Sequence, residues 1–315
     1  ELGLEDLVAA RTRLALDPAP GNFEAVFAVA EQWLQAQEGA VGKRDLTDFH
    51  DLVAHFESAG RAGLARKLRF ALIQVLEPAA PGDTVALTEL HRMASDAKQA
   101  RDWGLVIACL ERTLSGNPDI EEGVPHIDWM RIASASIWLE RWEDHQDLVE
   151  RMAGRYRDSP KAVALERTAK AYFASPMVDR NSSLSREILA MAHRSVVMVK
   201  DDTDGLRPWM ALAAGMGEYR MGNFPEALQF LEEVEREGAL ECRAVALPYL
   251  AMACRGLERH DQAAAYLEHA EKTVGPFFKT FGERRESTFW HDRSFAILAL
   301  QEARELFGNG NEDKP

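Results

Sequence analysis

The sequence predicts an all-α protein, a solenoid of about six helical hairpins followed by a closing helix. Apolar residues recur at the i, i+3, i+4, i+7 spacing of amphipathic helices, and Leu and Ala dominate while β-branched runs are short. A local pattern, in which a polar residue and an aromatic ring open an apolar helical run, returns about every 36 to 41 residues. It is clearest at Asn223–Ala227 and is repeated at Arg259–Ala263. A repeat of this length is typical of stacked helical hairpins.

The elements follow in order along the chain. The stripe from Phe23 to Leu34 predicts an N-terminal helix over residues 22–37. Six helical hairpins are then expected at residues 45–80, 84–121, 126–160, 161–203, 206–240 and 243–278. A last apolar stretch predicts a closing helix over 286–307, and the polar residues 308–315 are expected to be a disordered tail. Because no linker or change of composition interrupts residues 1–307, they are expected to form one continuous domain.

Composition limits the partners. The net charge is −14, with 51 acidic and 37 basic residues, so nucleic acid is not expected as a partner, and a protein or peptide of basic or mixed charge is compatible. Cys109, Cys242 and Cys254 are too few and too scattered for a disulfide framework or a zinc site. They indicate buried thiols in a reducing compartment, which predicts a cytoplasmic protein. No apolar run of 18 residues is present, so membrane insertion is not expected.

The motifs of catalysis and cofactor binding are not found. The glycines at Gly215–Gly217 and Gly222 lie within a helical pattern and have the wrong spacing for a nucleotide loop. No Gly-x-Ser-x-Gly elbow or metal-binding histidine pattern occurs, and His291–Asp292 is interpreted as a surface pair at the start of the closing helix. We therefore expect no catalytic residue, cofactor or metal, and no enzyme activity in this segment.

At this point the chain resembles the tetratricopeptide repeat (TPR) family. The family's pattern of apolar, small, Tyr, Gly, aromatic and Ala positions reads in the fifth hairpin as Leu212, Gly215, Tyr219, Gly222, Phe224 and Ala227. The third hairpin matches at Trp129, Ile132–Ala133 and Trp142, and the second in its later half. The resemblance implies a right-handed α-α superhelix. Small residues such as Gly215 would let paired helices approach closely, and the turn aromatic would fill the gap to the next repeat.

A narrower resemblance covers roughly residues 126–272. The segments Ala164–Lys170, Gly217–Arg220 and Glu241–Ala253 look like the C-terminal repeat region of large bacterial serine/threonine protein kinases. This implies a non-catalytic segment of a larger signalling protein, which a kinase domain could precede. The kinase motifs themselves are absent from the chain, so no activity is carried over.

In the TPR family the first helices of the hairpins line a concave groove. The positions that this implies for peptide or protein binding are Met130, Trp138, Trp209, Leu212, Met216, Tyr219, Arg220, Met252 and Arg255. Aromatic, Met and Arg side chains are common interface anchors, although the same side chains also pack between repeats. We expect an extended or helical segment near Trp209 and Tyr219, with Arg220 and Arg255 meeting its carboxylates.

The function expected is therefore a protein–protein interaction scaffold or a regulatory segment. One alternative is a small-ligand sensor that controls an attached kinase or transcription regulator, which a closed apolar cavity with convergent polar groups would favour. An all-α enzyme is a further alternative, and buried ionisable residues clustered in space would favour it. The terminal helices are also a candidate homodimer contact.

Overall fold

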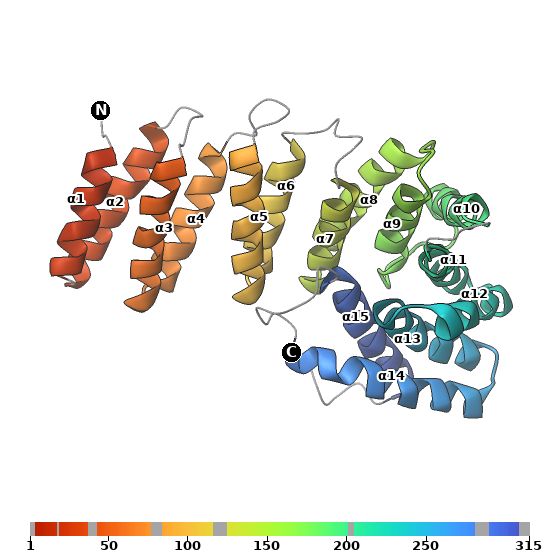
Figure 1. The fold of residues 1–315 in the computed structure, drawn as a ribbon. Helices are drawn as coiled ribbons and strands as arrows, with labels where there is room; N and C mark the ends of the chain where they lie inside the picture. Colours follow the sequence, from red (N-terminus) through yellow and green to blue (C-terminus); the bar gives the residue numbers. More distant parts are fainter. Residues whose placement is uncertain are drawn as a thin grey trace. The chain divides into compact units, whose positions relative to one another are not determined.

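The protein is all-α in the computed structural model, which describes residues 4–17, 19–36, 43–76, 84–115, 125–200, 205–280 and 290–308 (Figure 1). These residues form 15 helices and no strand. The chain divides into two compact units, Glu1–Gly123 and Val124–Pro315, whereas one continuous domain was expected. The boundary follows the Gly116–Pro118 stretch, whose residue types end helices. None of the described helices is long and apolar enough to cross a membrane.

Unit 1 consists of six helices in three successive pairs. They are α1 (Leu4–Leu16), α2 (Pro20–Ala36), α3 (Lys43–Ser58), α4 (Ala62–Val75), α5 (Thr84–Gln99) and α6 (Trp103–Ser115). The N-terminal helix expected from the sequence corresponds to α2, and α1 was not expected. Each helix packs against its pair partner, α1 also packs on α3, and α4 packs on both α2 and α6. The core is made by residues such as Phe49, Phe56 and Leu68, which are fully buried.

Unit 2 consists of four helix pairs and a last helix. The pairs are α7 (Pro125–Trp138) with α8 (Trp142–Tyr156), α9 (Ala162–Phe173) with α10 (Ser183–Met198), α11 (Arg207–Met221) with α12 (Phe224–Glu237), and α13 (Leu240–Gly256) with α14 (His260–Thr280). The last helix is α15 (Trp290–Leu306). The first helices of the pairs pack in succession, α7 on α9, α9 on α11 and α11 on α13. Residues 309–315, most of the expected tail, and residues 286–289 of the expected closing helix lie outside the described residues.

The sequence repeat has a structural counterpart in the turns of five hairpins. A residue with positive φ follows the first helix at Gly60, Arg101, Glu140, Gly222 and Glu258. In each case its N–H donates to the carbonyl three residues earlier, and the next N–H donates to the carbonyl five residues before it. This is the hydrogen-bond pattern of a helix C-terminus closed by a left-handed residue. The same turn therefore recurs in five hairpins; in the α9–α10 hairpin, whose longer break was noted in the sequence, no residue from Ala174 to Ser182 has a positive φ.

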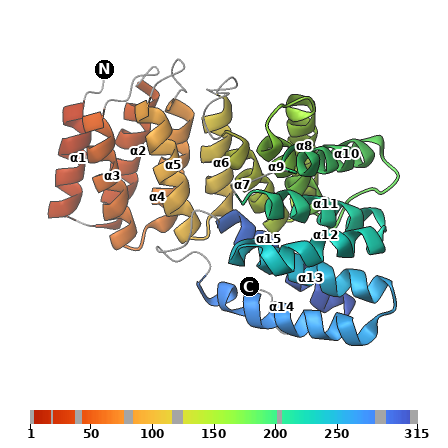
Figure 2. The same cartoon turned by 45° about the vertical axis from the view of Figure 1, so that its right-hand side comes forward.

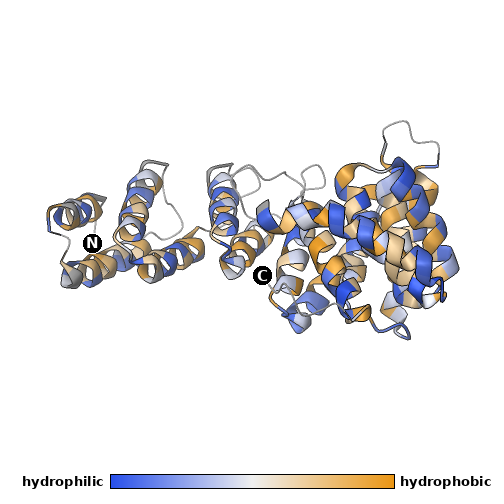
Figure 3. Ribbon diagram, turned by 90° about the horizontal axis from the view of Figure 1, so that it is seen from below, coloured by the Kyte–Doolittle hydropathy of each residue, from blue (hydrophilic) through white to orange (hydrophobic). Residues whose placement is uncertain are grey.

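Close helix contacts depend on glycine where the sequence pattern places it. A Cβ on Gly215 would lie 2.6 Å from Leu231 Cγ, so only glycine lets α11 approach α12 this closely. The ring of the turn residue Phe224 lies against Gly256, where a Cβ would come within 2.5 Å of it. In unit 1 the helices carry hydrophobic and hydrophilic residues on different sides, as amphipathic helices do (Figure 3).

Candidate functional site

The candidate site is the surface of unit 2 formed by α7, α9, α11 and α13, which we call the first-helix face. These are the helices that the sequence predicts to line a groove. In this structure α15 lies on that face and packs against α7, α13 and α14 (Figures 1 and 2). Ion pairs also join it to α9 and α11. One helix therefore contacts all four first helices.

Burial of α15 is nearly complete over its first three turns. From Trp290 to Leu300 no side chain is exposed, and Phe295, Ile297 and Leu300 are within 2% of full burial. On the opposite side of the contact, α11 is buried without interruption from Met210 to Arg220. A helix that is buried all round has neighbours on every side. For α11 these are α9, α10, α12 and α13, and α15 adds the Arg220–Glu302 ion pair.

The first ionic contact, which we call the α9 anchor, consists of Glu166, Lys170 and Asp292. Lys170 Nζ on α9 lies 2.7 Å from Glu166 Oε1 and 2.9 Å from Asp292 Oδ1 on α15, and the side chains of both carboxylates and of the lysine are at most 3% exposed. The Trp209 ring completes the site, with its centroid 4.6 Å from Nζ. Two carboxylates and an aromatic face thus surround one ammonium group.

Electrostatics of the α9 anchor favour the charged state of Lys170 and Asp292. Burial would lower the pKa of Lys170, but Asp292 and Glu166 outweigh it and raise that pKa. Burial would likewise raise the pKa of Asp292, but Lys170 and His291 hold it well below its usual range. For Glu166 burial dominates and raises the pKa, in spite of Lys170. The pair that crosses between helices, Lys170 with Asp292, is therefore formed by two charged groups.

The second contact, the α11 anchor, pairs Arg220 with Glu302. The guanidinium contacts both carboxylate oxygens, with Nη2 2.6 Å from Oε2. Its Nε also donates to the carbonyl of Phe173 at the end of α9, at 3.0 Å, and its Nη2 lies 3.2 Å from the Tyr249 hydroxyl. Arg220 therefore satisfies the last carbonyl of one helix, where a cation is favourable, while it holds the side chain of another.

Three outer contacts complete the attachment of α15. Arg293 pairs with Glu241 of α13 at 3.4 Å, and Arg304 donates to both oxygens of Glu271 of α14 at 2.7 Å. The guanidinium of Arg255 lies 4.7 Å from the ring centroid of Phe307, directly after α15. The helix is thus held at both ends by charged side chains and in the middle by apolar packing.

The residues predicted to bind a partner lie on the first helices, and most are already engaged. Met130, Leu212, Met216 and Met252 are at most 1% exposed. Tyr219 is also buried and its hydroxyl contacts Met252 Sδ at 3.5 Å. Trp138 and Trp209 are half-buried. Arg220 and Arg255 meet Glu302 and Phe307 of the same chain. The two arginines are therefore engaged by α15 and the residue after it, and the buried positions present no surface to a second molecule in this structure.

The interpretation of His291 and Asp292 as a surface pair was wrong, since both are 1% exposed. Burial lowers the pKa of His291, although Asp292 opposes the change. Sequence reasoning also missed Glu166, Lys170 and Glu302. A signal existed for the first two, because Glu166 and Lys170 stand one turn apart in a helical stretch that also holds Ala164, Leu165, Ala169 and Ala171.

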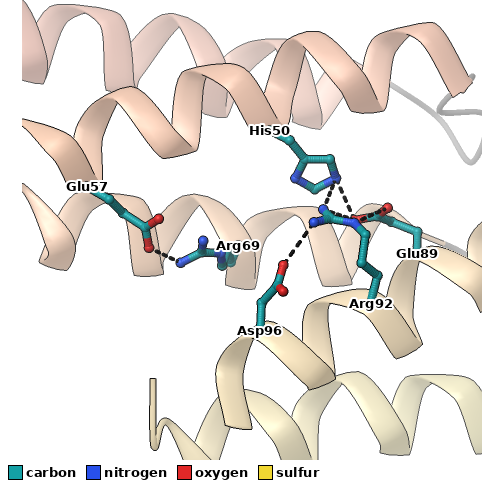
Figure 4. A network of polar contacts seen from close by, with 6 residues as sticks. All are labelled: His50, Glu57, Arg69, Glu89, Arg92 and Asp96. Atoms are coloured by element: carbon teal, nitrogen blue, oxygen red, sulfur yellow. Dashed lines mark hydrogen bonds and ion pairs between the residues drawn. The ribbon is translucent and has the colours of Figure 1, made fainter. Parts of the chain in front are cut away.

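A separate polar network lies in unit 1 between α3 and α5 (Figure 4). His50 Nε2 lies 2.5 Å from Glu89 Oε1 and 2.5 Å from Arg92 Nη2, and Arg92 also pairs with Asp96 at 2.9 Å. Burial would raise the pKa of Glu89, but hydrogen bonds from His50 and Arg92 lower it. The network is partly exposed and joins α3 directly to α5, which are the first helices of two successive pairs.

The cluster Glu166–Lys170–Asp292 is the kind of buried ionisable group that would favour an enzyme, yet its ammonium is enclosed by its own partners. Within the described ranges, no three His, Cys, Asp or Glu side chains are arranged to hold a metal ion. What the first-helix face does in this structure is bind a helix through two buried cations.

Comparison of the chain with protein-family models found no match, and comparison with curated proteins found none either.

Proposed function

We propose that the chain is a TPR-like helical-repeat segment of a larger bacterial signalling protein, and that it works in the cytoplasm as an interaction scaffold or regulatory segment. Its first-helix face would bind a segment of a protein partner. The resemblance of residues 126–272 to kinase-associated repeats supports the signalling context. The recurrent hairpin turn at a spacing of 36 to 41 residues supports a repeat architecture.

The single observation that carries this proposal is that the first-helix face holds α15 by side chains suited to recognition. Arg220 makes a two-point contact with a carboxylate, and Lys170 presents a buried ammonium to another. Buried, hydrogen-bonded charge pairs discriminate strongly between correct and incorrect partners. A face built in this way favours a protein segment over a small molecule as its ligand, because a protein segment can bind to an open surface and needs no enclosed cavity.

The experiment is affinity capture from a lysate of the source cell with two matched baits. In the first, Glu302→Arg places a cation opposite Arg220 and weakens the attachment of α15. In the control, Glu268→Arg reverses a carboxylate of the exposed pair with Lys272 on α14. We expect the Glu302→Arg chain to recover more of a protein partner than the wild type does. The Glu268→Arg control should recover no more than the wild type.

Circular dichroism of both baits would first establish that each is folded. Failure of every bait to recover a protein above background would overturn the scaffold proposal. The small-ligand sensor would then be the function to test, by thermal-shift screening of metabolites.

A further inference from the structure

A single nitrogen atom of His50 contacts two groups of opposite charge in the network between α3 and α5 (Figure 4). His50 Nε2 lies 2.5 Å from Glu89 Oε1 and 2.5 Å from Arg92 Nη2. A ring nitrogen donates when it carries a proton and accepts when it does not, so it cannot bond to both groups in one protonation state. We propose that His50 is a proton-controlled switch, which binds Arg92 when it is neutral and Glu89 when it is charged. This inference goes beyond the proposed function, because it concerns unit 1 and not the first-helix face.

The contact with Arg92 defines the neutral state. A guanidinium nitrogen only donates, so the position of Arg92 Nη2 requires that His50 Nε2 accepts. The proton of the neutral ring must then lie on Nδ1. Arg92 Nη2 also donates to Glu89 Oε1 at 2.7 Å, and Nε donates to Glu89 Oε2 at 3.1 Å. In the neutral state Arg92 therefore holds both the ring and the carboxylate.

The contact with Glu89 defines the charged state. Protonation places a hydrogen on Nε2, which then donates to Glu89 Oε1 in a charge-assisted hydrogen bond. Two donors cannot face each other at 2.5 Å, so Arg92 must leave the ring. Its Nη1 already lies 2.9 Å from Asp96 Oδ2, one turn further along α5. The displaced guanidinium therefore keeps a carboxylate partner, in a pair that is more exposed than the one with Glu89.

The site combines access to protons with a carboxylate that stays ionised. The side chain of His50 is 22% exposed, whereas that of Glu89 is 9% exposed. Burial would raise the pKa of Glu89, but hydrogen bonds from His50 and Arg92 lower it. The carboxylate is therefore charged at the pH at which a histidine gains its proton, and it can receive the charged ring.

Charged groups on the neighbouring helices are paired among themselves. They are Asp48 and Asp51 of α3 with Arg11 of α1, and Glu57 of α3 with Arg69 of α4. Burial and nearby carboxylates raise the pKa of Cys109 on α6 to about 12, so this thiol stays neutral. The exchange is therefore confined to His50, Glu89, Arg92 and Asp96.

The exchange affects a seam that depends on these side chains. Among the described helices of unit 1, α3 and α5 are not a closely packed pair, and the network bridges them. Protonation adds a positive charge at His50 and moves Arg92 toward the exposed Asp96. The distribution of charge on this side of unit 1 therefore changes with pH.

Nitrogen NMR of the full, isotope-labelled chain tests the inference, with His50→Gln used to assign the ring signals. Long-range proton–nitrogen spectra distinguish a ring nitrogen that carries a proton from one that does not. At about pH 8 we expect the proton of His50 on Nδ1, and at about pH 5 we expect protons on both nitrogens. The Nε–H signal of Arg92 should shift with the same midpoint as His50, and this shift should be lost in His50→Gln.

Matched variants separate the two contacts. Arg92→Gln removes the cation that opposes protonation, so the titration midpoint of His50 should rise by about 0.5–1 pH unit, and Glu89→Gln should lower it by about as much. The control Arg66→Gln removes an exposed arginine of the same unit that pairs with Asp102, and it should leave the midpoint unchanged.

A neutral His50 with its proton on Nε2 would overturn the inference, because that nitrogen would then donate to Glu89 in both states. An Arg92 signal that does not follow the titration of His50 would overturn it too, as would midpoints in Arg92→Gln and Glu89→Gln equal to that of wild type. The position of the proton is measured on the unmodified chain, so this outcome does not depend on the folding of the Arg92 and Glu89 variants.

Discussion

Lys170 and Arg220 are both buried cations that pair with a carboxylate of α15, but only one of them was predicted from the sequence. Arg220 was predicted as a contact for ligand carboxylates, and its guanidinium does meet a carboxylate, Glu302 of the same chain. Lys170 was not predicted, because lysine is rarely buried unless it is paired. Its partner Asp292 is more than a hundred residues away, so no local pattern could reveal it. Residue type predicted the chemistry of the contact, and only the fold supplies its partner.

His145 illustrates how burial makes a single residue sensitive to pH. It lies on α8 with 3% exposure, and its ring Nε2–H donates to the carbonyl of Ala171 at 3.0 Å. Burial lowers the pKa of His145 to about 4 from the usual 6.5, although this hydrogen bond acts in the opposite direction. The native state therefore resists a proton that the unfolded state accepts.

We expect unit 2 to lose stability as the pH falls from 6.5 to 4, because in this window the unfolded chain binds more protons than the native one. Protonation of His145 in the unfolded chain lowers the free energy of unfolding by about 3 kcal/mol at pH 4, and this effect is absent above pH 7. Urea unfolding of wild type and His145→Gln at several pH values measures it. The His145→Gln variant should show a shallower dependence of stability on pH than wild type, and the exposed control His260→Gln should match wild type. Identical pH dependence for all three proteins would contradict the assignment.

At the scale of elements, the prediction of an all-α protein was correct. Apolar periodicity indicates helices well, because it reflects local geometry. It could not show that the buried helices α11 and α13 meet α15, because those contacts join segments that lie far apart in the sequence. It also missed α1, whose stripe of Leu7, Ala10 and Leu14 is short and precedes the prolines at 18 and 20. His260, placed in the turn-aromatic position by the pattern, is exposed, unlike the buried Trp103.

The recurrent hairpin turn predicts a stabilising substitution. Glu140 has a φ of +56° in the α7–α8 turn, where the equivalent turns after α3 and α11 use Gly60 and Gly222. A side chain in this region is strained by about 1–2 kcal/mol relative to glycine, part of which is offset by the greater freedom of glycine in the unfolded chain. We expect Glu140→Gly to raise the free energy of unfolding by about 0.5–1 kcal/mol.

The matched reverse change is Gly222→Ala in the α11–α12 turn, which should lower the free energy of unfolding by a similar amount, because its φ is +85°. Both are measured by urea unfolding at pH 7. A destabilising Glu140→Gly would mean that the Glu140 side chain contributes more than the backbone strain costs.

At the scale of the whole molecule, the chain consists of two compact units rather than the one domain expected. Uniform composition does not reveal such a division, because it depends on which helices pack together. In unit 2 the attachments of α15 to α7, α9, α11, α13 and α14 are all internal to the unit. The closing helix predicted from the sequence is therefore part of the core of one unit.

Unit 2 is accordingly expected to fold by itself. A fragment of residues 124–315 should unfold in one cooperative transition with the helical content of the unit, measured by circular dichroism and urea unfolding. The control ends at Thr280 and lacks α15; with the first-helix face uncovered, it should bind hydrophobic dyes and lose the sharp transition. A sharp, unchanged transition for this shorter fragment would contradict the role given to α15.

The position of α15 also has a consequence for how the chain acquires its structure. In arrays of hairpins most contacts are local, so folding can begin at any repeat and spread to its neighbours. Here the Arg220–Glu302 contact spans 82 residues and that of Lys170 with Asp292 a still longer segment. Closing such loops slows folding and makes it depend on distant parts of the chain. During synthesis the apolar surfaces of α9, α11 and α13 would remain open until the last helix leaves the ribosome, which is the interval in which a chaperone would be most needed.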